Sequence, residues 1–90
     1  MDQADLIDIE RLVAAAEQGR VEALFELGLC YATGQGVAQD YIAAHKLFNI
    51  AAIRGSLSAR ERRAELARDM TAEQVAEAQR QAREWIAQRG

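Results

Sequence analysis

The chain has 90 residues, a formal net charge of −3 at pH 7, one cysteine and no proline. This length corresponds to one small domain, and the lack of proline together with few β-branched residues predicts an all-α fold. Binding to nucleic acid or to an anionic membrane requires a basic surface, so the acidic balance argues against both partner classes.

The cysteine content and the N-terminal sequence bear on where the protein works. Cys30 has no second cysteine to pair with in the chain, so no disulfide within the chain requires an oxidising compartment. The first ten residues carry acids where a secretory signal carries a basic segment, and no run approaches the roughly 20 apolar residues of a membrane span. If the chain is complete, we expect a cytoplasmic protein.

Helical periodicity predicts two helices in the first third of the chain. The first has apolar residues at spacings of three and four, ends at Gly19, and can be capped by Asp2 or Asp5. These apolar residues are Leu6, Ile9, Val13 and Ala16. The second helix is predicted between Arg20 and Thr33. Because it is apolar around most of its circumference, we expect it to pack against more than one neighbour.

Two glycines separate the second helix from a third. Gly34 and Gly36 permit a tight reversal, Asp40 can cap the third helix, and Gly55 ends it. The residues expected on one face of this helix are Tyr41, Ala44, Phe48, Ala51 and Ala52. Its alanines, together with Gly28 in the preceding helix, favour a close approach of the two helices.

Serine and threonine capping patterns predict two further helices. One runs from Ser58 to Asp69, with Ser58 and Glu61 spaced as a capping box. The other follows Thr71, which forms a second capping box with Gln74. The main apolar contacts expected are Leu66 and Ala67 in the fourth helix and Val75, Ala78, Ala82 and Trp85 in the fifth.

A repeat connects these elements at an offset of 36 residues, as between Gly19 and Gly55. The residues that recur are Ala15, Ala16, Gly19 and Ala23, matched by Ala51, Ala52, Gly55 and Ala59. Periods of about 20 to 50 residues with two helices per unit are typical of a helical solenoid. We therefore predict an α-α superhelix of antiparallel helix pairs with about five helices. A partial repeat spans 1–19, a full repeat spans 20–55, and a divergent C-terminal capping repeat spans 56–90.

The full unit resembles the Sel-one-like repeat family, a branch of the tetratricopeptide-type helical repeats, as found in short bacterial members. The matching residues are Ala23, Leu27, Gly28, Tyr31, Gly34, Gly36, Val37, Asp40, Ala44, Phe48, Ala51, Ala52, Gly55 and Ala59. The resemblance implies stacked helix pairs whose first helices line a concave surface, and a protein-interaction role rather than catalysis. Cysteine-rich relatives with β-lactam binding pin each hairpin with a disulfide, which the lone Cys30 cannot form.

Other chemistry has weaker support in the sequence. The TGQGV turn lacks the lysine and the serine or threonine of a phosphate-binding loop, and it joins two helices. Cys30 and His45 lie on facing helices, but no third orienting group is evident and His45 is expected outside the apolar face. The arginines near the fourth helix alternate with acids and lack aromatic neighbours. We expect no catalytic residue, cofactor or metal site.

The candidate partner-binding residues are those that the repeat leaves exposed on the first helices. They are Glu22, Glu26, Leu29 and Thr33, with Arg62 and Glu65 at the equivalent positions of the next unit. The offset predicts that Glu26 lies beside Arg62. Leu29 is the expected anchor, because it is the apolar residue of the set. The leading hypothesis is an adaptor or scaffold module for a peptide or protein. The alternatives are a self-assembling structural unit, possible as a homo-oligomer, and a weak β-lactam-binding hydrolase-like protein.

Overall fold

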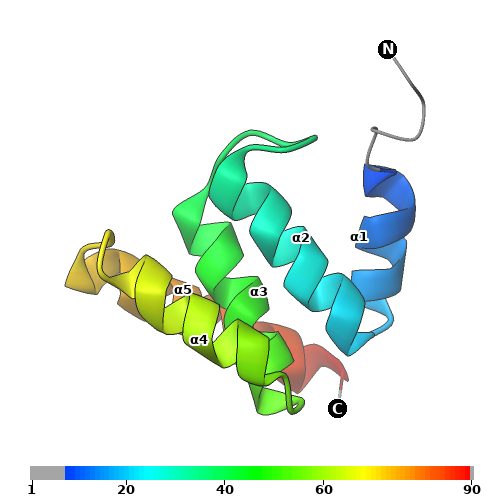
Figure 1. The fold of residues 1–90 in the computed structure, drawn as a ribbon. Helices are drawn as coiled ribbons and strands as arrows, with labels where there is room; N and C mark the ends of the chain where they lie inside the picture. Colours follow the sequence, from blue (N-terminus) through cyan, green and yellow to red (C-terminus); the bar gives the residue numbers. More distant parts are fainter. Residues whose placement is uncertain (1–7, 90) are drawn as a thin grey trace.

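The computed structural model describes residues 8–89, and within that range it contains five helices and no strand (Figure 1). The helices are α1 (Ile9–Glu17), α2 (Val21–Thr33), α3 (Tyr41–Ile53), α4 (Leu57–Ala67) and α5 (Ala72–Arg89). The predicted all-α helical-repeat fold with about five helices is confirmed.

The third helix, α3, lies at the centre of the domain. It packs against α2, α4 and α5, while α1 packs against α2 and α4 also touches α2. Figure 1 shows α1 and α4 on opposite sides of α2. The exposed surface of α2 therefore has one neighbouring helix on each side, and this arrangement positions the candidate site.

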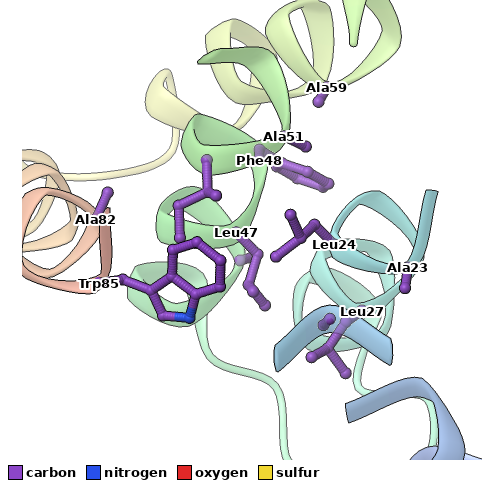
Figure 2. Packing of buried hydrophobic residues seen from close by; sticks show 12 residues of the cluster. Ala23, Leu24, Leu27, Leu47, Phe48, Ala51, Ala59, Ala82 and Trp85 are labelled. Atoms are coloured by element: carbon purple, nitrogen blue, oxygen red, sulfur yellow. The ribbon is translucent and has the colours of Figure 1, made fainter. Parts of the chain in front are cut away.

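The core is built from small and medium apolar side chains, with few large ones. Its largest fully buried side chains are those of Leu24, Phe48 and Ile50. Figure 2 shows Trp85 projecting from α5 toward Leu47 of α3, with Leu24 of α2 opposite them. Each of the five helices carries at least one buried alanine, and this small side chain lets the helices pack closely.

The glycine turn between α2 and α3 has the predicted geometry. Gly34 and Gly36 have φ angles of 77° and 74°. Residues other than glycine rarely adopt this backbone conformation. Asp40 then caps α3, because its Oδ1 accepts a hydrogen bond from the Ala43 N–H at 3.1 Å. The turn reverses the chain so that α3 runs back along α2.

Two predicted helix starts are wrong. The structure begins α1 at Ile9 with Asp8 as its N-cap, and Asp2 and Asp5 lie outside the described residues. The helix α4 begins at Leu57 and not at Ser58, because Ser56 is its N-cap and accepts a hydrogen bond from the Ala59 N–H at 3.1 Å. The proposed capping box of Ser58 and Glu61 therefore lies inside the helix.

The start of α5 agrees with the sequence. The Gln74 N–H donates to Thr71 Oγ1 at 3.1 Å, and the Thr71 N–H donates to Gln74 Oε1 at 2.9 Å. These two bonds form the reciprocal capping box that was predicted. The buried face of α5 includes Ala78, Ala82 and Trp85, also as predicted.

Two expectations about burial need correction. His45 was placed outside the apolar face of α3, but only 2% of its surface is exposed. Leu66 and Ala67 were expected to be the main apolar contacts of α4; Leu66 packs against the core as expected, but the fully buried residue of this helix is Ala59. The burial of His45 follows from the central position of α3, which packs against α2, α4 and α5.

Among the helices of residues 8–89, none is both long and apolar enough to cross a membrane.

Candidate functional site

The solvent-facing side of α2 carries four of the six predicted partner-binding residues. Glu22, Glu26 and Thr33 are exposed and Leu29 is half-buried. Their spacings of four, three and four place them on one strip of the helix. The Thr33 hydroxyl donates to the Leu29 carbonyl oxygen at 2.8 Å, so it is already engaged with its own helix.

On one side of this strip, α2 and α4 enclose a hollow of about 170 Å³. Its lining residues are Leu29, Ala32, Thr33, Phe48, Arg62, Glu65, Leu66 and Asp69. Four of the predicted site residues, Leu29, Thr33, Arg62 and Glu65, are therefore brought together by the fold. Leu29, Phe48 and Leu66 supply an apolar floor, and the charged side chains come from α4.

The charged groups at this hollow are only weakly engaged with each other. Arg62 Nε lies 3.9 Å from Glu65 Oε1, and the two side chains are 56% and 66% exposed. An ion pair this long and this exposed contributes little to stability. Both groups are therefore available to an incoming partner at small energetic cost.

Glu22 and Glu26, at the N-terminal end of the strip, lie toward α1. They line a separate hollow of about 590 Å³ between α1 and α2, whose apolar part includes Leu12 and Val21. Glu26 and Arg62 line different hollows, and Arg62 forms its ion pair with Glu65. Glu26 lies beside residues of α1, and its proximity to Arg62 stays a prediction.

Cys30 and His45 show no sign of acting as a catalytic pair. Cys30 is buried and free, and burial, followed by the nearby Glu26 charge, raises the pKa of its thiol. A thiol in that environment stays protonated, whereas the thiolate is the reactive form. Burial, followed by the charge of Arg63, lowers the pKa of His45, and His45 Nδ1 has no hydrogen-bond partner. Within residues 8–89, no three His, Cys, Asp or Glu side chains gather in a way that could hold a metal ion.

A family comparison adds to this geometry. Residues 21–56 match the model of the Sel1 repeat. This segment is similar to a Sel1 repeat. It includes α2, the glycine turn, α3 and the Ser56 cap of α4. Sel1 repeats are helical repeats that typically mediate protein–protein interaction, and they are not an enzyme family. No curated protein and no solved structure gives a significant match to the chain.

The structure also joins the two ends of the described chain, beside the Sel1 repeat, in a way that the sequence pattern did not reveal. Arg89 of α5 forms an ion pair with Glu17 of α1 and stacks over Trp85, with its guanidinium carbon 3.7 Å from the ring centroid. Arg54, at the end of the Sel1 repeat's second helix, lies over the same ring at 5.4 Å and donates to the Gly19 carbonyl oxygen at 3.4 Å. The only sequence feature that could have indicated this contact is the position of Arg54, Arg89 and Trp85 near the ends of their helices.

Proposed function

We propose that the protein is a non-enzymatic adaptor or scaffold module that binds a peptide or protein segment on the face formed by α2 and α4. The observation that carries the proposal is the shared hollow between these helices, where an apolar floor meets charges of both signs. The Sel1 repeat supports the class of function, since its family typically mediates protein–protein interaction. A cytoplasmic location belongs to the same proposal and is consistent with the free thiol of Cys30.

The binding energy would come mainly from apolar contact. Leu29 is half-buried, so a partner side chain that covers it removes the remaining apolar surface from water. Interfaces usually depend on a few central anchors, while charges at the rim set orientation and association rate. We assign the anchor to Leu29 and the orienting role to Arg62 and Glu65, with Thr33 at the edge of the same surface.

Glu22 and Glu26 extend the proposed surface along α2, beyond the shared hollow. Both are exposed and lie on the same helical strip as Leu29. A partner longer than the hollow would reach them, and it would match them best with basic side chains. In this proposal the full repeat of 20–55 supplies most of the surface, and the units 1–19 and 56–90 are a partial repeat and a divergent capping repeat.

The test is affinity capture from a cell extract followed by mass spectrometry, with the wild-type chain and three variants. Leu29→Asp and Arg62→Glu change the proposed surface, whereas Arg83→Glu is a matched control on the exposed face of α5. We expect the first two variants to lose the same captured proteins and the control to retain them. Circular dichroism confirms that each variant is folded. Identical partners for all four proteins would refute the assigned surface.

Self-assembly is a second candidate, favoured by the distribution of exposed charge. The α1 and α2 side carries the exposed acids Glu10, Glu22 and Glu26, and α4 carries the exposed arginines Arg60 and Arg62 beside the acids Glu61 and Glu65. Opposite charges on two sides of one chain favour head-to-tail contact between copies.

Sedimentation velocity over a range of concentrations, at low and high salt, tests this second candidate. Self-association should grow with concentration, weaken with salt and be reduced by Arg62→Glu. Adding Glu26→Arg to Arg62→Glu restores opposite charges and should restore association. A monomer at every concentration would exclude self-assembly, while leaving the adaptor proposal intact.

A further inference from the structure

A second hollow, away from the α2 and α4 surface, lies among α1, α2, α3 and α5. Its volume is about 160 Å³. The apolar part of its wall comes from all four helices and includes Val13, Leu24, Leu27, Leu47 and Trp85. Figure 2 shows how Leu47 and Trp85 face Leu24 across this region. The hollow therefore has an apolar interior shaped by the closure of α5 onto the rest of the domain.

The size of this hollow suits a small apolar group. Apolar cavities of about 150 Å³ in other proteins stay free of ordered water and accept a benzene-sized molecule. A group of that size would contact the indole of Trp85 and the leucines around it. Because these side chains are already ordered by the core, binding would require little further loss of conformational freedom.

The mouth of the hollow is polar. Lys46, Gln81 and Trp85 line both this hollow and an adjoining one of about 320 Å³, whose wall is mostly polar. The two hollows therefore meet at these three residues. A ligand that fills the inner hollow with an apolar group would place any polar head beside Lys46.

Lys46 is the lining charge that is left for such a ligand. The carboxylate of Glu17 is paired with Arg89. Arg80 is likewise held by carboxylates on its own helix, at 2.5 Å from Glu77 and 2.6 Å from Glu84. Lys46 is half-buried and forms no ion pair with any residue from 8 to 89. Its ammonium group thus provides charge complementarity for an anion.

We propose that this hollow binds a carboxylate attached to a compact apolar group, with the apolar group against Trp85 and the carboxylate beside Lys46. Two sources share this chemistry: a free small carboxylic acid and the C-terminal residue of a polypeptide. The site uses residues of α1, α2, α3 and α5, and it shares no lining residue with the hollow of the proposed adaptor surface. The two proposals can therefore succeed or fail independently.

The experiment is a titration of the full, ¹⁵N-labelled chain with benzoate, followed by amide and indole NMR signals. Benzyl alcohol serves as the uncharged probe of nearly the same size. Because the chain has one tryptophan, the single indole N–H signal reports on the hollow directly. We expect benzoate to shift the indole signal and the amides around Leu24 and Leu47 in a saturable way, and to leave the α4 amides unchanged.

The role of the charge is tested with Lys46→Gln and its conservative counterpart Lys46→Arg. The first should weaken benzoate binding by roughly fivefold or more, since it removes a charge-assisted contact, and should leave benzyl alcohol binding unchanged. The second should retain most of the benzoate affinity. Arg83→Gln, on α5 but outside both hollows, is the matched control and should behave as wild type.

A separate variant tests the apolar interior without touching Lys46. Val13→Leu adds one carbon at the wall of the hollow and should weaken benzoate and benzyl alcohol alike. The proposal is overturned if benzoate leaves the indole signal in place, or if it binds Lys46→Gln as tightly as wild type. The amide spectrum of each variant shows whether it is folded before its affinity is compared.

The source of the ligand is tested with the tripeptide Ala-Ala-Phe, as the free acid and as the C-terminal amide. Tighter binding of the free acid than of benzoate, with loss of binding for the amide, assigns the site to polypeptide C-termini. Binding of benzoate without binding of the tripeptide assigns it to free small carboxylic acids. Equal binding of the acid and the amide would contradict a role for the carboxylate.

Discussion

Gly28 is a point of close approach between α2 and α3. A Cβ atom added there would stand 2.6 Å from Phe48 Cε1 and 2.7 Å from Cδ1, closer than such atoms can lie. Phe48 is fully buried and its ring is 5.8 Å, centroid to centroid, from that of Phe25. The ring therefore cannot move away freely, and the absence of a side chain at Gly28 sets the distance between the helices.

We predict that Gly28→Ala lowers the free energy of unfolding by about 1 to 3 kcal/mol, the usual cost of overfilling a packed core. Urea unfolding followed by circular dichroism measures this loss. Combining Gly28→Ala with Phe48→Leu tests the cause, because the smaller side chain makes room for the added methyl group. The double variant should lose less than the sum of the single losses; strict additivity would mean that Phe48 is not the obstacle.

His45 should make the stability of the protein depend on pH. Its pKa is lowered in the folded state by burial and then by Arg63, while the unfolded chain has the ordinary value of about 6.5. As the pH falls below about 6.5, the unfolded state takes up the proton first, so folding is progressively destabilised until the folded pKa is reached. At pH values well above 6.5 this effect disappears.

Urea unfolding at about pH 7.5 and about pH 5.5 measures the effect, since His45 is the only histidine. His45→Gln should remove most of the difference between the two conditions. The pKa of Glu77, lowered from 4.5 to about 2 chiefly by its hydrogen bond to Arg80, acts only in more acidic solution and does not overlap this window. An unchanged pH dependence in His45→Gln would contradict the assignment.

At the scale of the helix, the local capping signals decided most of the predicted boundaries. Asp40 and the pair Thr71 and Gln74 bond to backbone N–H groups only a few residues away, so their role is visible in the sequence. The start of α4 was ambiguous because Ser56 and Ser58 are both serines near the expected end of α3. In the structure Gly55 has a φ of 107° and is followed directly by the N-cap residue Ser56. A capping pattern in the sequence does not describe this backbone conformation.

The two serines offer a matched pair for testing the cap. Ser56→Ala should lower the free energy of unfolding by about 1 kcal/mol, because the Ala59 N–H loses its hydrogen-bond acceptor. Ser58→Ala, at an exposed position inside the helix, should be neutral or slightly stabilising, since alanine is the better helix former. Thermal unfolding of both variants compares them, and a larger loss for Ser58→Ala would reverse the assignment.

Position in the fold explains why His45 was misplaced. Periodicity identifies a buried face when a helix has one wet side, but α3 contacts three other helices and has buried residues around most of its circumference. A polar residue on such a helix can be buried even outside the apolar face that periodicity predicts. The sequence of α3 alone could not reveal this, because the covering helices α4 and α5 come later in the chain.

At the scale of the whole molecule, the 36-residue offset predicted part of the candidate site. It places Leu29 of α2 opposite Glu65 of α4, and both residues line the same hollow. It also places Glu26 opposite Arg62, but these two line different hollows, because an offset fixes the position along a helix and not the direction in which a side chain points. The hollow at Lys46 depends on how α5 returns to α1, which no local pattern describes.

The return of α5 to α1 should hold the first helix in place. Arg89 contacts both Glu17 and Trp85, so Arg89→Ala removes an ion pair and a cation–π contact together. We predict a loss of about 1 kcal/mol in the free energy of unfolding and faster amide hydrogen exchange in α1, with exchange in α3 changed less. Arg83→Ala, at an exposed position of the same helix, is the control. Equal hydrogen exchange in α1 of both variants would argue against a role of Arg89 in holding α1.

The stacking of two guanidinium groups on Trp85 gives the protein an optical reporter of its own closure. The indole is the only one in the chain, it is 8% exposed, and it lies where α1, α3 and α5 meet. Its fluorescence will respond when these three helices separate and will be insensitive to fraying confined to α4. Emission intensity can therefore follow the opening of the domain without any attached dye, while the face between α2 and α4 is occupied by a partner.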